Sequence, residues 1–391
     1  MKKKNFQILA MLMLAIMVTI SACKKDAAND ETPAPAPTEF TVAQNITSNT
    51  TWATGNTYTL ASRVTVTAGA TLTIQPGVII KGEAGTGANA TALLVARGGK
   101  IDAQGTATQP IIFTSVADEI KAGDIASPNL DPDLNGLWGG VIVLGNAPIS
   151  ADAPSVQIEG IPPSDQNGLY GGSTPTDNSG VIKYISIRHG GTNIGEGNEI
   201  NGLTLGGVGS ETIIENVEIV SNQDDGIEWF GGTVNVTNAV IWNTGDDAVD
   251  TDQSWAGTLN NFIVVNPGDE CCELDGPEGT MEAGHLLING TLFADGADGL
   301  VDLDDNSIVE MSAIYFFGLA DGQDFDLKPT GLVAANFQAT IPAGFTKADF
   351  FKDGIDAIVT EVAEGANTVG ADVTKFQNWS WASVSGALDN F

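Results

Sequence analysis

Seven acidic residues recur at nearly even intervals in the second half of this sequence, in a pattern that could hold metal ions. They fall into two sets, Asp250, Glu273, Asp302 and Asp326 in one and Asp252, Asp275 and Asp304 in the other. Counted from Glu228, the offsets along the first set are 22, 23, 29 and 24 residues. If each repeat occupies one rung of stacked strands, equivalent carboxylates lie about 4.8 Å apart. Divalent cations such as Ca²⁺ take several carboxylate and carbonyl oxygens, so they could bridge these rungs.

The negative charge of this part of the sequence is not balanced by basic residues. Between Arg188 and Lys328 the chain contains 27 Asp and Glu residues and no Lys or Arg. Two interpretations follow, and the sequence leaves both open. The acids form a solvated face that keeps the protein soluble while salt screens their repulsion, or they form a calcium site.

The segments that carry these acids alternate residue by residue, which is the period of a β-strand. A second short strand is expected before each of the first three segments, at 217–220, 239–242 and 262–265, each preceded by an Asn. A repeat of about 22 to 25 residues with short apolar strands is typical of a solenoid. The alternation assigns one face to Ile227, Trp229, Val249, Thr251, Cys272, Leu274, Val301, Leu303, Phe325 and Leu327, and the other face to the acids.

At this point the chain resembles the right-handed parallel β-helix proteins, the pectate-lyase-like architecture. LTIQPGVIIKG, from Leu72, and LLVARGGKIDAQGTATQPIIFTS, from Leu93, resemble the opening turns of a largely uncharacterised family of secreted Bacteroidetes β-helix proteins. The resemblance covers about residues 60–385 and implies an all-β fold and an extracellular location, but no reaction. We expect the β-helix over 41–330 and an aromatic-rich C-terminal cap over 331–391, because an open coil end exposes unpaired strand edges.

Two turns resemble the catalytic turns of polygalacturonases, which share this architecture: 222–226, with Asp225, and 245–247, with Asp246 and Asp247. Carboxylates from neighbouring rungs are what inverting glycoside hydrolysis needs. The resemblance then stops, because 268–270 reads Gly-Asp-Glu where that family has Gly-His-Gly, and the Arg and Lys that bind a uronate are missing. Polysaccharide lyases are disfavoured for the same lack of a base. The three Asp residues fit turn formation or Ca²⁺ ligation more simply.

Long polar loops at 116–136 and 150–180 are expected to project from one side of the coil. Trp138 and Tyr170 lie at or near the ends of these loops, where aromatic rings could stack on sugars. Packing of both rings against the coil wall is the alternative. The sequence identifies no other ligand-binding residues.

The N-terminus reads as a lipoprotein signal. Residues 1–22 combine a basic start with the apolar run from Ile8 to Ile20, and the segment ending in Cys23 resembles the bacterial lipobox. That resemblance implies cleavage before Cys23 and acylation of it, which anchors the chain in a membrane. Residues 23–40 form a Pro-rich tether, and Lys followed by acids after Cys23 resembles the surface-export signal of Bacteroidetes lipoproteins. The expected location is the outer membrane, on the cell surface.

The net charge of −33 excludes nucleic acid as a partner, because binding it requires basic surface. The sequence therefore predicts a lipid-anchored, rigid, acidic binding scaffold that uses Ca²⁺ to contact extracellular glycan or an envelope component. A polysaccharide-degrading enzyme is one alternative. A structural subunit of an outer-membrane complex is the other.

Overall fold

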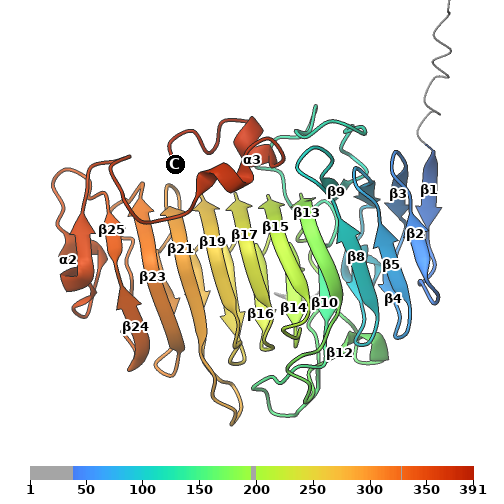
Figure 1. The fold of residues 1–391 in the computed structure, drawn as a ribbon, viewed down its shortest axis with the longest axis horizontal. Coiled ribbons are helices and arrows are strands. Elements are labelled where there is room, and N and C mark those ends of the chain that lie inside the picture. The colour runs from blue at the N-terminus through green and yellow to red at the C-terminus, as the bar shows by residue number, and fades with distance from the viewer. Residues whose placement is uncertain (1–37, 195–199, 327) are drawn as a thin grey trace, which may run out of the picture. The chain divides into compact units, whose positions relative to one another are not determined.

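The computed structural model describes residues 38–194, 200–326 and 328–391. Within this part of the chain, short parallel strands coil into a right-handed parallel β-helix, as Figure 1 shows and as the sequence predicted. Apolar side chains from successive windings fill its interior in one continuous core. No helix in these ranges has the length and apolar character needed to cross a membrane.

Two large parallel sheets make up the described coil. The first, sheet A, comprises β1 (Glu39–Val42), β2 (Thr50–Trp52), β3 (Thr57–Leu60), β5 (Thr71–Ile74), β6 (Ile79–Gly82), β8 (Lys100–Gln104), β9 (Ile111–Ser115), β13 (Gly180–Arg188), β15 (Ile213–Val220), β17 (Asn235–Trp242), β19 (Thr258–Val265), β21 (His285–Phe293), β23 (Ile308–Phe317), β24 (Gly331–Ala335), β25 (Phe337–Ala339) and β26 (Val359–Glu361). The second, sheet B, comprises β4 (Arg63–Val66), β7 (Ala92–Val95), β10 (Val141–Leu144), β14 (Leu203–Gly206), β16 (Ile227–Phe230), β18 (Val249–Asp252), β20 (Cys272–Leu274) and β22 (Asp302–Leu303).

The remaining elements lie in loops and near the C-terminus. They are the antiparallel pair β11 (Val156–Gln157) and β12 (Leu169–Tyr170), the 3-10 helices η1 (Gly87–Asn89), η2 (Gln166–Gly168), η3 (Ile355–Ile358) and η4 (Val373–Phe376), and the α-helices α2 (Lys347–Phe350) and α3 (Trp381–Val384).

The predicted alternation is confirmed in sheet B. Ile227 pairs with Val249 and Val249 with Cys272, and all three side chains are fully buried. The next residues along point outward, so the pairing stacks Glu228, Asp250, Glu273 and Asp302 on successive windings. A slip of one residue would move every apolar side chain to the outside, and this cost fixes the register. Leu327, which was assigned to the inner face, lies outside the described residues.

The strands of sheet A are longer than the sequence predicted. We expected strands to begin after Asn216, Asn238 and Asn261, but β15, β17 and β19 run through these residues. Each Asn has a positive φ, of 59°, 59° and 61°, so it bends its strand without ending it. Asn tolerates this left-handed conformation better than most residues do. Side-chain amides join the bends, since Asn238 Nδ2 donates to Asn216 Oδ1 at 2.9 Å and Asn261 Nδ2 to Asn238 Oδ1 at 2.7 Å.

Replacing Asn238 by Ala is expected to lower the free energy of unfolding by about 2 kcal/mol, because Ala is strained at positive φ and the two amide hydrogen bonds are lost. Asn238→Gly removes the same hydrogen bonds but accepts the backbone conformation, so it should cost less. Urea unfolding of both variants checks this. Equal losses for Ala and Gly would show that backbone strain plays no part.

The C-terminal region does more than close the coil. The repeat continues past residue 331, where the cap was expected to begin, because β24 and β25 pair in parallel with β23. Phe350, Phe351 and Ile355 then pack on the last winding of the core. Residues 371–391 turn back and pack on outward-facing residues of sheet A, and in Figure 1 α3 lies at the carboxyl ends of its middle strands. We call residues 371–391 the C-terminal strap.

Candidate functional site

The outer face of sheet B changes from apolar to acidic along the coil. In one outward-facing column Leu94 pairs with Ile142 and Ile142 with Thr204, and the next residue in the column is Glu228. The 145–179 loop covers the apolar part, with Ile149, Ile158, Ile161 and Tyr170 packed on Leu94, Ile142 and Leu144. Because this loop ends where the acids begin, it forms a wall beside an uncovered acidic surface.

An acidic pocket of about 510 Å³ lies on that surface. It contains three candidate catalytic residues, Asp225, Asp246 and Asp247, together with three predicted calcium ligands, Asp250, Glu273 and Asp302. We predicted the catalytic candidates and the calcium ligands as two separate sets, and the structure places members of both in one pocket. The other lining residues are also acids: Glu159, Asp224, Glu228, Asp269 and Glu270. No Lys or Arg lines the described pocket.

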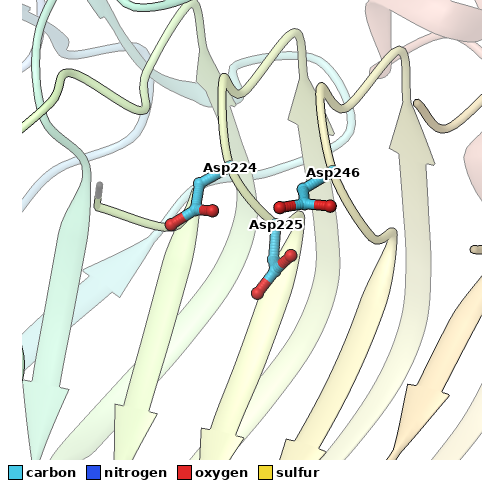
Figure 2. A group of neighbouring side chains, drawn as sticks. All are labelled: Asp224, Asp225 and Asp246. Carbon is cyan, nitrogen blue, oxygen red and sulfur yellow. The ribbon is translucent and has the colours of Figure 1, made fainter. Parts of the chain in front are cut away.

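Two overlapping groups of carboxylates have the spacing of metal ligands. Oxygens of Asp224, Asp225 and Asp246 lie within 4.8 Å of one another, and so do oxygens of Asp225, Glu228 and Asp250. Figure 2 shows the first group, in which Asp224 and Asp225 come from one turn and Asp246 from the next. Asp225 belongs to both groups. A hard cation in either group would meet three carboxylates, which is the donor chemistry that Ca²⁺ prefers.

Hydrogen bonds from backbone N–H groups to side-chain carboxylates hold the turns in register. Asp225 Oδ1 accepts from the Asp247 N–H at 3.1 Å, and Asp247 Oδ1 accepts from the Glu270 N–H at 2.7 Å. Glu228 Oε2 accepts from Asn201 Nδ2. Each winding therefore positions the acid of the next, so the same residues both shape the turns and line the pocket.

The negative charge of the pocket's carboxyl groups is not balanced by any Lys or Arg among the described lining residues. Burial, reinforced by neighbouring carboxylates, raises the pKa of Asp225, Glu228 and Asp250 well above the ordinary range. Burial and a hydrogen bond with Glu273 raise the pKa of Asp247 to about 11. Without a cation, some of these groups remain protonated at neutral pH, because ionising all of them places like charges together in a low-dielectric site.

Thermal stability in chelator is therefore expected to fall as the pH rises from about 5 to about 8. Burial raises the pKa of Asp252 to about 6 and that of Asp275 to about 7. A carboxyl whose pKa is higher in the folded state contributes its full stability below its unfolded pKa of about 4 and loses it as pH rises through the folded pKa. The melting temperature in EDTA should fall by several degrees over this pH range. In Asp275→Asn it should depend less on pH. Melting temperatures that rise with pH would contradict the expectation.

The remaining predicted calcium ligands lie outside the pocket. Asp252, Asp275 and Asp304 form a neighbouring column, in which burial first and the nearby carboxylates second raise the pKa of Asp252 and Asp275. Asp326 is exposed at the far end of the acidic stack, next to Asp302. Of the seven predicted ligands, the structure thus brings Asp250, Glu273 and Asp302 into the pocket.

Sequence reasoning missed five lining residues. Asp224, Asp269 and Glu270 belong to acidic pairs at 224–225, 246–247 and 269–270, which repeat with the period of the strands. That repeat could have identified them. Glu228 began the predicted column but was not chosen as a ligand. Glu159 comes from the 145–179 loop, which has no period and gives no such signal.

The two aromatic candidates are buried and present no exposed ring face. Trp138 packs in the core and donates from Nε1 to the Arg188 carbonyl at 2.7 Å. Tyr170 packs in the loop core and donates to Gln253 Oε1 at 3.0 Å. Both rings are therefore packed within the protein, which was the alternative to sugar stacking. The loops also differ from expectation: instead of projecting from one side, the segment around Ile120 covers sheet A, while the 145–179 loop covers sheet B.

Comparison with known families gives one finding that bears on this site. The family model described as the pectate-lyase-like β-helix domain matches residues 44–289, well over half of the chain. The match includes the strands from β2 to β20 and all lining residues of the acidic pocket except Asp302. None of the curated proteins matches the chain.

Proposed function

Because this chain belongs to the pectate-lyase-like β-helix family, we propose that it binds carbohydrate through calcium ions held in the acidic pocket. The family membership supports a polysaccharide-related role. The observation that carries the proposal is the lining of the pocket, which consists of eleven carboxylate side chains with no basic residue among those described. Such a surface repels anionic polymers unless cations intervene.

The residues present fit Ca²⁺. It takes six to eight oxygen ligands in a flexible geometry, and the two carboxylate groups supply such oxygens around the shared Asp225. Asp224 and Asp246 would hold one ion with Asp225, and Glu228 and Asp250 a second. The bound ions supply positive charge and open coordination positions. Asn201, which donates to Glu228, fixes the orientation of one ligand.

The glycan best suited to this site is anionic. Carboxylate groups of an acidic polysaccharide can complete the coordination of a bound cation, whereas a neutral glycan offers only hydroxyl oxygens. The wall formed by the 145–179 loop contributes Glu159 to the pocket and limits the ligand on one side. The chain would act as a rigid scaffold, since the carboxylates are carried by stacked strands and turns.

The proposed setting is the cell surface, with the protein anchored in the outer membrane through acylated Cys23. Residues 1–37, which include the signal and Cys23, lie outside the described residues. The support is the sequence pattern alone. Membrane fractionation of the full-length protein and of Cys23→Ser tests it, because loss of the acylated Cys should release the protein from the membrane fraction.

A glycan array with and without Ca²⁺ tests the binding proposal. The full-length protein should bind acidic glycans in Ca²⁺ and lose the signal in EDTA. The variant Asp225→Asn/Glu228→Gln/Asp250→Asn should lose it in both buffers. Glu310→Gln is a matched control, because Glu310 is an exposed acid on β23, away from the pocket. Binding that survives EDTA, or that the triple variant retains, would refute calcium-dependent recognition at this pocket.

Glycoside hydrolysis is a second candidate, favoured by the convergence of Asp225, Asp246 and Asp247 in one pocket. The spacing disfavours the inverting mechanism. Oxygens of Asp225 and Asp246 lie within 4.8 Å, while inverting enzymes separate their two carboxyl groups by about 6.5–9.5 Å to admit water. Release of reducing ends from acidic polysaccharides, lost in Asp246→Asn but retained in Glu310→Gln, would favour the enzyme over the binding protein.

A further inference from the structure

The two ends of the coil are finished differently. At the C-terminal end, Phe350, Phe351 and Ile355 pack on the last winding and close the core. At the N-terminal end, which Figure 1 shows at the opposite end of the coil from α2, β1 pairs with β3 and β2 pairs with β5. Among the described residues, no strand adds to the other edge of β1 or β2, so this end of the coil is open.

A pocket of about 460 Å³ lies at this open end. Its apolar lining includes Phe40, Val42, Ile46, Trp52 and Tyr58. The three rings form a stack, in which the centroid of Tyr58 lies 5.2 Å from that of Phe40 and 4.8 Å from that of Trp52. Trp52 and Tyr58 are buried, whereas Phe40 is 43% exposed. The stack therefore ends in a large apolar ring that the described chain leaves in contact with solvent.

The backbone edge of β1 beside this ring is unprotected. The carbonyls of Thr38 and Val42 accept from the N–H groups of Thr57 and Ala61, on the side of β3. Because successive residues of a strand direct their backbone groups to opposite sides, the N–H and carbonyl of Thr41 face the open edge. Exposed edges are commonly blocked by Lys, Pro or a bulge. The sequence of β1, Glu-Phe-Thr-Val, contains neither Lys nor Pro, and its pairing with β3 has no bulge.

The charge of the chain does not oppose association at this end. Residues 38–115 contain four Lys or Arg and three Asp or Glu, whereas residues 116–391 contain seven and 43. In sheet B the first strand, β4, lies four strand spacings from β16, where the acidic column begins. That separation is about 19 Å, more than twice the Debye length of about 8 Å at physiological salt. The open end is therefore the place where two copies of this acidic chain repel each other least.

We infer that two copies of this chain associate through their N-terminal ends, with β1 antiparallel to β1 across a twofold axis. Such an interface uses the same surface on both copies. A second copy fits this end better than a single extended peptide, because three separate segments end there: β1, β2 and the residue Ile46, which bridges Val66 of β4. One peptide pairs with one of these segments, whereas a second coil presents all three and a second Phe40. The association involves neither the acidic pocket nor calcium.

The test is sedimentation velocity of the full-length protein in detergent and EDTA, over a wide range of protein concentration. EDTA removes cations that would bridge two acidic surfaces. The protein should change from monomer to dimer as its concentration rises. Thr41→Pro should raise the dissociation constant of the dimer at least about tenfold, because Pro lacks the N–H and the twofold axis removes each hydrogen bond twice. The variant should stay folded, which circular dichroism checks, because the Thr41 N–H does not face β3.

Thr41→Val is the matched control, since it keeps the N–H, and it should dimerise as the unmodified protein does. Phe40→Glu should also weaken the dimer at least about tenfold, because it brings two like charges together at the interface. Val333→Glu should not, because Val333 is an exposed residue of β24, away from the open end. A protein that stays monomeric at every concentration overturns the inference. So does a dimer that Thr41→Pro and Phe40→Glu leave intact, as association through acyl chains would, or that Val333→Glu weakens equally.

Discussion

Millimolar Ca²⁺ is expected to raise the melting temperature of the chelator-treated protein by roughly 5–10 °C. Asp225, Glu228 and Asp250 are each less than a tenth exposed and lie together, and none of them pairs with a Lys or Arg of the described residues. At a Ca²⁺ concentration 100 times its dissociation constant, one bound ion stabilises the folded state by about 2.7 kcal/mol. Two ions double this gain, and a chain of this length converts each kcal/mol into roughly 1–2 °C. Differential scanning calorimetry with and without Ca²⁺ measures the shift.

The variant Asp225→Asn/Glu228→Gln/Asp250→Asn should lose the calcium response. In EDTA it should melt at or above the temperature of the unmodified protein, because it removes carboxylates that repel one another. Mg²⁺ should stabilise less than Ca²⁺, since it requires a tighter octahedral site and gives up its water reluctantly. The interpretation of the pocket as a cation site fails if Ca²⁺ leaves the melting temperature unchanged or shifts the triple variant by the same amount.

The coil itself was predictable because its constraint is repeated. Each winding has to bury alternate residues at equivalent positions. Apolar residues at offsets of 22 and 23, namely Ile227, Val249 and Cys272, therefore indicate the register. The acidic column follows from that register automatically. The bends at Asn216 and Asn238 were not predictable in the same way. An Asn before an apolar run is compatible both with a corner and with a strand that passes through a left-handed residue.

The walls of the site were harder to predict because they depend on contacts distant in sequence. The 145–179 loop lies on sheet B because Tyr170 packs against Gly206, where an added Cβ would lie 2.9 Å from the ring. The repeat that predicts the register of the coil does not predict a contact between Tyr170 and Gly206. Glu159 reaches the acidic pocket only because the loop packs this way. Alternation therefore predicts the floor of the pocket, whereas its enclosure depends on a fit between individual side chains.

The position of the C-terminal strap was also not predictable, because it depends on contacts distant in sequence. Its aromatic residues indicated burial, but the partner surface was not apparent. Trp381 packs near Val220, Val240 and Trp242 on the outer face of sheet A, not on the end of the coil. The strap also covers the charged residue Arg188, which is fully buried. Burial of this cation under an apolar cover is costly unless it is paired. Its partners are the carboxylate of Glu218 and the hydroxyl of Ser186, which accepts from Arg188 Nε at 2.7 Å.

Replacing Glu218 by Ala is therefore expected to lower the free energy of unfolding by about 3–5 kcal/mol, since it leaves a buried charge uncompensated. Arg188 Nη2 lies 3.6 Å from Glu218 Oε2, and the guanidinium carbon lies 4.9 Å from the centre of the Trp381 ring. Glu218 also ties down the strap, because its Oε1 accepts from the Ala382 N–H at 2.9 Å. Urea unfolding followed by Trp fluorescence measures the loss.

Glu215→Ala provides the matched control on the same strand, β15. Glu215 pairs with Lys183 at 2.9 Å, but its side chain is 43% exposed. An ion pair in water contributes at most about 1 kcal/mol, so this shorter contact should matter less than the longer buried one. Arg188→Met/Glu218→Leu should recover most of the stability that Glu218→Ala loses, because it removes both charges and keeps the volume filled. If Glu218→Ala costs no more than Glu215→Ala, the buried pair does not hold the strap on the coil, and its apolar contacts alone must do so.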